Sequence, residues 1–173
     1  MALHIIIDGY NLIRQSRELA AIDRRDMQAG REALLEKLAR YRKVKPYRIT
    51  VVFDGSYAKG LYPRRDVYKG VTVIYSSGAD TADDVIKDMA EKETRLLVVS
   101  SDSSVASYSE LHGAESISSP DFEMRMEMAL AFGADEPDME AETESWDGTT
   151  RKKGPARREP KAKRRQQNVF KKL

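Results

Sequence analysis

The sequence contains no cysteine, which excludes disulfide bonds and thiolate metal sites. It has no apolar run near the roughly 18 residues that a membrane span requires, so we expect no membrane partner. Strand-like apolar sequence begins almost at Met1, which leaves no space for the basic and apolar regions of a signal peptide. We therefore expect a cytoplasmic protein.

Charge is abundant but unevenly distributed along the chain. Residues 151–173 contain eleven Lys and Arg and one acid, a net charge of +10, which leaves −8 for residues 1–150 because the whole chain carries +2. Residues 135–147 contain seven acids and no base. Such segments bury too little apolar surface to offset the entropy of ordering. We expect an acidic linker over 134–150 and a basic, disordered tail over 151–173.

Strand and helix patterns alternate from the start of the chain to residue 133. Short apolar or β-branched runs predict strands at residues 3–7, 47–53, 71–75, 95–100 and 114–117. Helical periodicity predicts helices at residues 12–21, 26–43, 81–93 and 104–112, and a last helix from a Ser119 cap to Gly133. Residues 55–70, with glycine, proline, tyrosines and several bases, are predicted to form a long loop. This alternation is typical of a mainly parallel sheet in a three-layer α/β sandwich, which we place in one domain, residues 1–133.

Acidic residues follow four of the predicted strands. Asp8 and Asp54 end two of them, while Asp80, Asp83 and Asp102 come shortly after two others. The carboxyl ends of parallel strands meet at one edge of a sheet, where ligands bind. Carboxylates gathered there repel one another unless a cation lies between them. The pattern predicts a divalent-metal site and, with it, phosphate chemistry.

Each of these acids also has a structural interpretation when it is taken alone. Asp8 and Asp54 both precede glycine, as in ordinary turns. Thr81 and Asp84 have the spacing of a capping box, and Asp102 can cap the following helix. Asn11 can either cap a helix or hold a carboxylate or phosphate. The coincidence of all the acids at one sheet edge favours the metal site.

Four stretches together resemble the YacP-like branch of NYN domains, which belongs to the PIN-like nuclease fold: residues 6–13 (IIDGYNLI), 51–55 (VVFDG), 79–86 (ADTADDVI) and 98–102 (VVSSD). The resemblance covers roughly residues 3–130 and leaves the basic tail outside. It implies a Rossmann-like domain with a Mg²⁺- or Mn²⁺-dependent RNase site. YacP-like proteins include an endoribonuclease that acts on messenger RNA at the ribosome.

The resemblance also assigns roles to individual residues. Asp8, Asp83 and Asp102 match the core acids, and Asn11 joins them as a catalytic candidate. Asp80 is a further metal-ligand candidate, and Asp54 is a supporting one. His4 lies within a strand and His112 at a helix end, so metal-free acid–base RNase chemistry is disfavoured.

The predicted loop over 55–70 interleaves aromatic and basic side chains, a mixture that suits single-stranded RNA. Its candidate RNA-binding residues are Lys59, Tyr62, Arg64, Arg65 and Lys69. A solvated loop with packed tyrosines explains the same pattern equally well. The basic tail can bind RNA or a ribosome through salt-dependent contacts, or serve only solubility.

Three other functions fit parts of this pattern. The main alternative is an RNA- or ribosome-binding module with the same fold and little or no catalysis. A second alternative is a phosphohydrolase of the haloacid-dehalogenase type. Such enzymes normally have a second Asp two residues after the first, and Tyr10 at that position weakens this alternative. DNA cleavage also stays open, because no residue in the sequence identifies a reader of the ribose 2′-hydroxyl.

Overall fold

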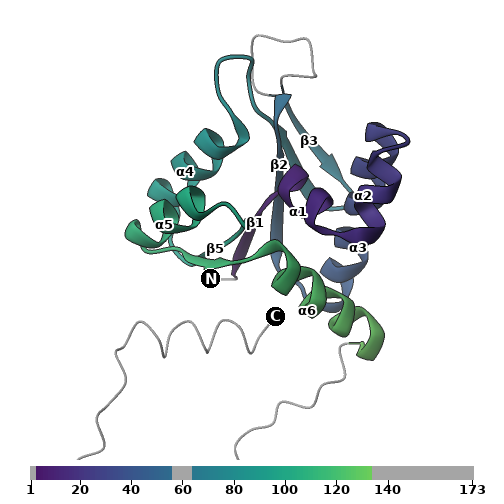
Figure 1. Ribbon diagram of the computed structural model, residues 1–173. Helices are drawn as coiled ribbons and strands as arrows, with labels where there is room; N and C mark the ends of the chain where they lie inside the picture. Colours follow the sequence, from purple (N-terminus) through teal and green to yellow (C-terminus); the bar gives the residue numbers. More distant parts are fainter. Residues whose placement is uncertain (1–2, 56–63, 134–173) are drawn as a thin grey trace, which may run out of the picture.

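The computed structural model describes residues 3–55 and 64–133 (Figure 1). Within them, six strands form one sheet in the order β3-β4-β2-β1-β5-β6. The strands are β1 (His4–Asp8), β2 (Arg48–Phe53), β3 (Arg64–Tyr68), β4 (Val71–Tyr75), β5 (Leu96–Val99) and β6 (Glu115–Ile117). The helices are α1 (Gly9–Gln15), α2 (Arg17–Asp23), α3 (Met27–Val44), α4 (Ala82–Lys92), α5 (Ser103–Leu111) and α6 (Ser119–Phe132).

The sheet lies between two helical layers, as the sequence predicts. Helices α1, α2, α3 and α6 cover one face, and α4 and α5 cover the other (Figure 1). Every residue of β1 is buried, as expected for a central parallel strand covered on both sides. Ile5 and Ile7 point into the core beneath α3 and α6, while Ile6 packs with Ile86 of α4. The predicted α/β fold is therefore confirmed.

The prediction of a loop over residues 55–70 is wrong for residues 64–68, which form β3. This strand runs antiparallel to β4, unlike the parallel pairs in the rest of the sheet. A tight turn joins the two strands through Lys69 and Gly70, which have positive φ angles of 46° and 86°. Most of β3 is exposed at the sheet edge, so its sequence lacks the apolar alternation that identifies a half-buried strand.

Two helix boundaries also differ from the sequence prediction. The helix expected over 12–21 is interrupted at Ser16, which has an extended backbone and caps α2 by accepting the Leu19 N–H at 3.2 Å. The last helix is capped by Ser118 and not by Ser119, because the Ser118 side chain accepts the Asp121 N–H at 3.3 Å. Pro120 remains in the first turn, where its missing N–H costs no helical hydrogen bond.

No helix in residues 3–55 and 64–133 is both long and apolar enough to cross a membrane. Residues 134–173 are outside the described residues. The domain boundary at 133, the acidic linker and the disordered tail therefore stay predictions.

Candidate active site

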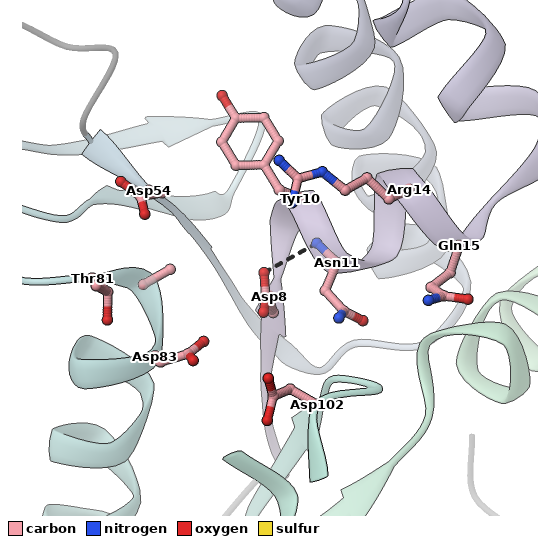
Figure 2. A pocket seen from close by; sticks show the side chains of 10 residues that line it. Asp8, Tyr10, Asn11, Arg14, Gln15, Asp54, Thr81, Asp83 and Asp102 are labelled. Atoms are coloured by element: carbon pink, nitrogen blue, oxygen red, sulfur yellow. Dashed lines mark hydrogen bonds between the residues drawn. The ribbon is translucent and has the colours of Figure 1, made fainter. Parts of the chain in front are cut away.

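A pocket of about 400 Å³ opens at the carboxyl edge of the sheet (Figure 2). Four acids from four separate segments line it: Asp8 at the end of β1, Asp54 after β2, Asp83 in the first turn of α4 and Asp102 before α5. Asn11, Arg14 and Tyr10 of α1 line the same space. We call this the acidic pocket. It brings together most of the acids that the sequence analysis selected.

Asp8 is both the last residue of β1 and the N-cap of α1, because the helix follows the strand directly. Its Oδ1 accepts the Asn11 N–H at 3.1 Å, and the residue is only 8% exposed. Burial raises the pKa of Asp8 to about 6 despite the Asn11 hydrogen bond, and the negative charges of Asp83 and Asp102 add to the rise. A poorly hydrated carboxylate facing other acids favours the approach of a cation.

Asp83 and Asp84 are neighbours in sequence but have different surroundings. Asp84 completes the capping box of α4, in which its side chain accepts the Thr81 N–H at 2.9 Å. These bonds from Thr81 lower the pKa of Asp84. Asp83 instead faces the acidic pocket, where partial burial and then the charge of Asp102 raise its pKa. The helix start thus separates a structural acid from a candidate functional one.

Asp102 is the N-cap of α5, as one of the two sequence interpretations expects. Its Oδ1 accepts the N–H groups of Ser104 at 2.7 Å and Val105 at 3.3 Å. The residue also lines the acidic pocket. Since both capping bonds use one carboxylate oxygen, Asp102 can cap the helix and still present Oδ2 to a ligand.

Two Asp-Gly pairs shape the strand ends at this edge. A Cβ on Gly9 would lie 2.3 Å from the Phe53 ring, and a Cβ on Gly55 would lie 1.8 Å from the Ser76 carbonyl oxygen. Glycine is therefore required after both Asp8 and Asp54 so that the backbone can turn beside its neighbours. The interpretation of Asp8-Gly9 as an ordinary turn is wrong, because Gly9 is the first residue of α1 and Asp8 is its N-cap, and both acids line the pocket.

Asn11 links three segments around the pocket. Its Oδ1 accepts the Ser101 N–H at 2.9 Å and the Ser119 hydroxyl at 2.7 Å. Because a backbone N–H can only donate, these bonds fix which end of the amide is oxygen. Asn11 thereby ties α1 to the segment before Asp102 and to the start of α6. Its Nδ2 donors remain as the group that it can offer to a phosphate.

Arg14 and Tyr10 line the acidic pocket but are absent from the primary site prediction. Arg14 was identifiable only as one of several basic residues on a helix, and its charge acts to lower the pKa of Asp8. Tyr10 is 6% exposed, and its hydroxyl accepts a hydrogen bond from Arg31 Nη1 at 3.1 Å. Arg14 lies over the Tyr10 ring, 5.6 Å from its centre, which places one cation beside the acids.

Other selected residues lie away from this pocket. Asp80 is exposed, accepts a hydrogen bond from the Ser77 hydroxyl at 2.9 Å and does not line the pocket. Arg64 and Arg65 are exposed on β3, on opposite faces of the sheet, whereas Lys69 contacts Glu36 at the far end of the strands. The remaining RNA-binding candidates, Lys59 and Tyr62, are outside the described residues.

The donor set of the acidic pocket consists of carboxylate and amide oxygens, which suit a hard cation. Among the described residues, no three Asp, Glu or His side chains lie close enough together to form a ready ligand set.

Comparison with known proteins gives consistent matches. The uncharacterized protein YacP of Bacillus subtilis is 30% identical over 102 residues, which cover 57% of this chain and 59% of that protein, less than two thirds of its length. A crystal structure of a mutant of Rae1 (YacP) from Bacillus subtilis has a TM-score of 0.64 at 24% identity, covering 75% of this chain and 77% of that one. A second Rae1 (YacP) crystal structure has a TM-score of 0.59 at 27% identity and covers 76% of each chain.

The family model described as the YacP-like NYN domain matches residues 5–170. The expectation that the shared region ends near residue 130 is therefore wrong, since the match includes most of the basic tail. This is a nuclease-type domain, which indicates an RNA-related function. From its sequence match and its fold, the chain belongs to the YacP-like NYN domain family.

Proposed function

We propose that this protein is a divalent-metal-dependent endoribonuclease that cleaves single-stranded or ribosome-associated RNA in the acidic pocket. The observation that supports this most is the convergence of Asp8, Asp54, Asp83 and Asp102 on one space from four separate segments. A binding module gains nothing from clustered negative charge where it must hold phosphates. A hydrolase gains a cation site.

Mg²⁺ or Mn²⁺ fits these residues. Asp8 is the principal ligand because it is buried and its charge is poorly compensated, and Asp83 and Asp102 are the next candidates. Mg²⁺ is commonly held by one or two carboxylates, with water and substrate phosphate in its other positions. That preference agrees with a pocket that lacks three clustered ligands among the described residues. When bound, such a cation stabilises charge on the phosphate and acidifies a water.

The protein's own side chains have complementary tasks. Arg14 neutralises a phosphate oxygen at the entrance, and the Nδ2 group of Asn11 donates a hydrogen bond to the phosphate. Asn11 also positions Asp8 through its backbone N–H and the segment before Asp102 through its side chain. Asp54 adds negative charge at the pocket wall and supports the cation.

RNA is favoured as the substrate by the family and by the distribution of basic residues. Arg64 begins β3 opposite Tyr75, at the same sheet edge as the pocket, and residues 151–173 have a net charge of +10. A single strand can bend so that one phosphate enters a recessed site while flanking phosphates contact these cations. Binding to messenger RNA on the ribosome is part of this proposal.

An RNA- or ribosome-binding module with little or no catalysis is the second candidate. The incomplete ligand set among the described residues favours it. The two candidates predict the same RNA binding in EDTA and differ in what happens when metal is added.

The test is cleavage of a labelled single-stranded RNA by the purified full chain with Mg²⁺ or Mn²⁺. We expect internal cleavage by the wild type, none in EDTA, and a loss of at least about 100-fold in Asp8→Asn. Asp88→Asn, an exposed acid of α4 paired with Lys92, is the matched control and should cleave normally. Metal-independent binding without cleavage would support the binding module, and full activity of Asp8→Asn would refute the site.

A further inference from the structure

A second pocket, of about 490 Å³, lies between α3 and the β3–β4 hairpin. Leu35, Val73 and Tyr75 give it an apolar wall, and Gln28, Arg31 and Glu32 of α3 line its polar side. We call this the α3–β3 pocket. Its combination of ring surface and hydrogen-bonding groups differs from the carboxylate lining of the acidic pocket.

Side-chain contacts connect the walls of the two pockets, although no residue lines both. Arg31 Nη1 donates to the hydroxyl of Tyr10, which lines the acidic pocket, and the Arg31 guanidinium lies 5.9 Å from the centre of the Tyr75 ring. Phe53 packs between these tyrosines, with its ring centre 5.1 Å from that of Tyr10 and 5.7 Å from that of Tyr75. Contacts therefore run without interruption from one pocket to the other.

The topology places the pockets a short distance apart along the same edge. Tyr75 ends β4, which pairs with β2, and β2 pairs with β1, which ends at Asp8. Neighbouring strands are about 4.8 Å apart, so the Cα atoms of Tyr75 and Asp8, two strands apart, are separated by roughly 10 Å. Tyr75 points to the α3 face of the sheet, and Asp8, like Ile6, points to the α4 face, so a chain with one phosphate in the acidic pocket must pass over the sheet edge to place a neighbouring nucleotide beside Tyr75.

The charges of the α3–β3 pocket are balanced. Its two cations, Arg31 and Arg64, are matched by Glu32 and Asp66, and Arg64 pairs with Asp66 at 3.3 Å. Gln28 accepts a hydrogen bond from Arg31 at 2.5 Å and donates one to Glu32 at 2.8 Å. Balanced charge inside the pocket favours neither a phosphate nor a metal ion, whereas Arg64 in its largely exposed pair with Asp66 can still contact a phosphate at the rim. The pocket suits a neutral planar group with donors and acceptors on its edge.

We propose that the α3–β3 pocket binds a nucleobase of the RNA, on a nucleotide that flanks the cleaved phosphate. The base stacks against the surface formed by Arg31, Tyr68 and Tyr75, since guanidinium planes and aromatic rings are the usual stacking partners of unpaired bases. Its edge exchanges hydrogen bonds with Gln28 and Glu32. This inference rests on the proposed RNA substrate and adds a source of base preference to it.

The test uses a short single-stranded RNA in which each nucleotide in turn is replaced by an abasic ribose. Affinity for the full chain is measured by fluorescence anisotropy in EDTA, so binding is read without cleavage. Loss of one base at a fixed position should weaken binding about tenfold, which corresponds to the energy of one stacked base. Mapping the cleavage products of the same RNAs in Mn²⁺ then locates that position relative to the cleaved bond.

Two variants connect the profile to the pocket. Arg31→Lys retains the charge but loses the planar group, and Gln28→Ala, on the rim of the pocket, removes hydrogen bonds. In each variant, removal of that base should weaken RNA binding by less than about threefold. Arg40→Lys, the same substitution on an exposed part of α3, should retain the wild-type profile. Circular dichroism checks the fold, and Gln28→Ala decides the outcome if Arg31→Lys does not fold.

The outcomes separate this inference from the proposed function. A flat abasic profile in the wild type, or an unchanged profile in both variants, overturns the base pocket even if the protein cleaves RNA. A base-dependent profile that the variants flatten supports the pocket even if no cleavage is found.

Discussion

Two groups of charged side chains in this protein lie in poorly hydrated surroundings, and they differ in how the fold compensates them. Lys37 is 7% exposed, and its Nζ contacts Glu18 at 2.6 Å and Glu127 at 2.8 Å, so it joins α3 to α2 and α6. Burial alone would lower the pKa of Lys37, but these two acids raise it. The charge of Lys37 is thus balanced by acids of the same chain, as expected of a structural ion-pair group.

The acidic pocket shows the opposite arrangement. Its four carboxylates have Arg14 as the one basic residue among the described lining residues, and Asp8 is nearly as buried as Lys37. A folded chain retains such a charge imbalance at a cost in stability. The contrast suggests that the counter-charge for Asp8 comes from outside the chain.

Asp8→Asn should have the largest effects on cleavage and stability, and it tests the contrast between the two groups most strongly. Besides losing cleavage, this variant should be more stable than the wild type in EDTA, by about 1–3 kcal/mol, because a buried charge with a raised pKa is replaced by a neutral group of the same shape. Asparagine is also a good N-cap, so α1 should be preserved. Chemical denaturation at pH 7 measures the difference. A clear loss of stability would mean that the charge of Asp8 is compensated in the fold.

Asn11→Ala should have the next largest effect. It removes the acceptor of the Ser101 N–H and the Ser119 hydroxyl, so the segment before Asp102 loses its link to α1. We expect cleavage to fall about 10–100-fold and the free energy of unfolding to fall by about 1–2 kcal/mol. Ser119→Ala, which removes only one of the two bonds, should lose less of both. Equal losses in the two variants would contradict a linking role for Asn11.

Lys37→Met should sharpen the comparison from the structural side. It retains the aliphatic chain but leaves Glu18 and Glu127 without their shared cation, and these acids can be rehydrated because they are largely exposed. We expect a loss of about 1–2 kcal/mol in the free energy of unfolding and an unchanged cleavage rate per folded molecule. A large fall in the cleavage rate would remove the distinction between the two groups.

The smallest expected effect is the pH dependence due to His4. Burial lowers the pKa of His4, and it outweighs the hydrogen bond to Glu93, so the folded protein favours the neutral ring. Since the unfolded chain takes up this proton near pH 6.5, the contribution of His4 to stability should decrease as the pH falls below that value, whereas Asp8, with its pKa raised to about 6, acts in the opposite direction. Denaturation at pH 7.5 and 5.5 should show that the free energy of unfolding changes less favourably on acidification in the wild type than in His4→Gln. An equal change in the two proteins would show that other groups are responsible.

Much of the site could be predicted because it depends on local sequence. An apolar run followed by Asp-Gly identifies a strand end, and the Thr81–Asp84 spacing identifies a cap, since both use contacts within a few residues. The capping box also indicates which of Asp83 and Asp84 is structural. The parallel topology then brings the strand ends to one edge.

The remaining features depend on distant partners. The bonds of Asn11 to Ser101 and Ser119 join residues about 90 to 110 positions apart, and no local pattern encodes them. Asp80 follows its strand within a few residues, as Asp102 does, but the turn before α4 directs it to Ser77 and not into the pocket. Strand β3 was not predicted, because its polar sequence has no strand pattern and it forms a strand only by pairing with β4.

The most direct test of the central claim compares Asp83→Asn with Asp84→Asn. These neighbouring acids differ in that one lines the acidic pocket and the other caps α4. The measurement is the rate of Mn²⁺-dependent cleavage of a single-stranded RNA by the full chain. We predict a loss of at least about 100-fold for Asp83→Asn and less than about threefold for Asp84→Asn. Equal rates for the two variants, or a greater loss for Asp84→Asn, would contradict catalysis in the acidic pocket.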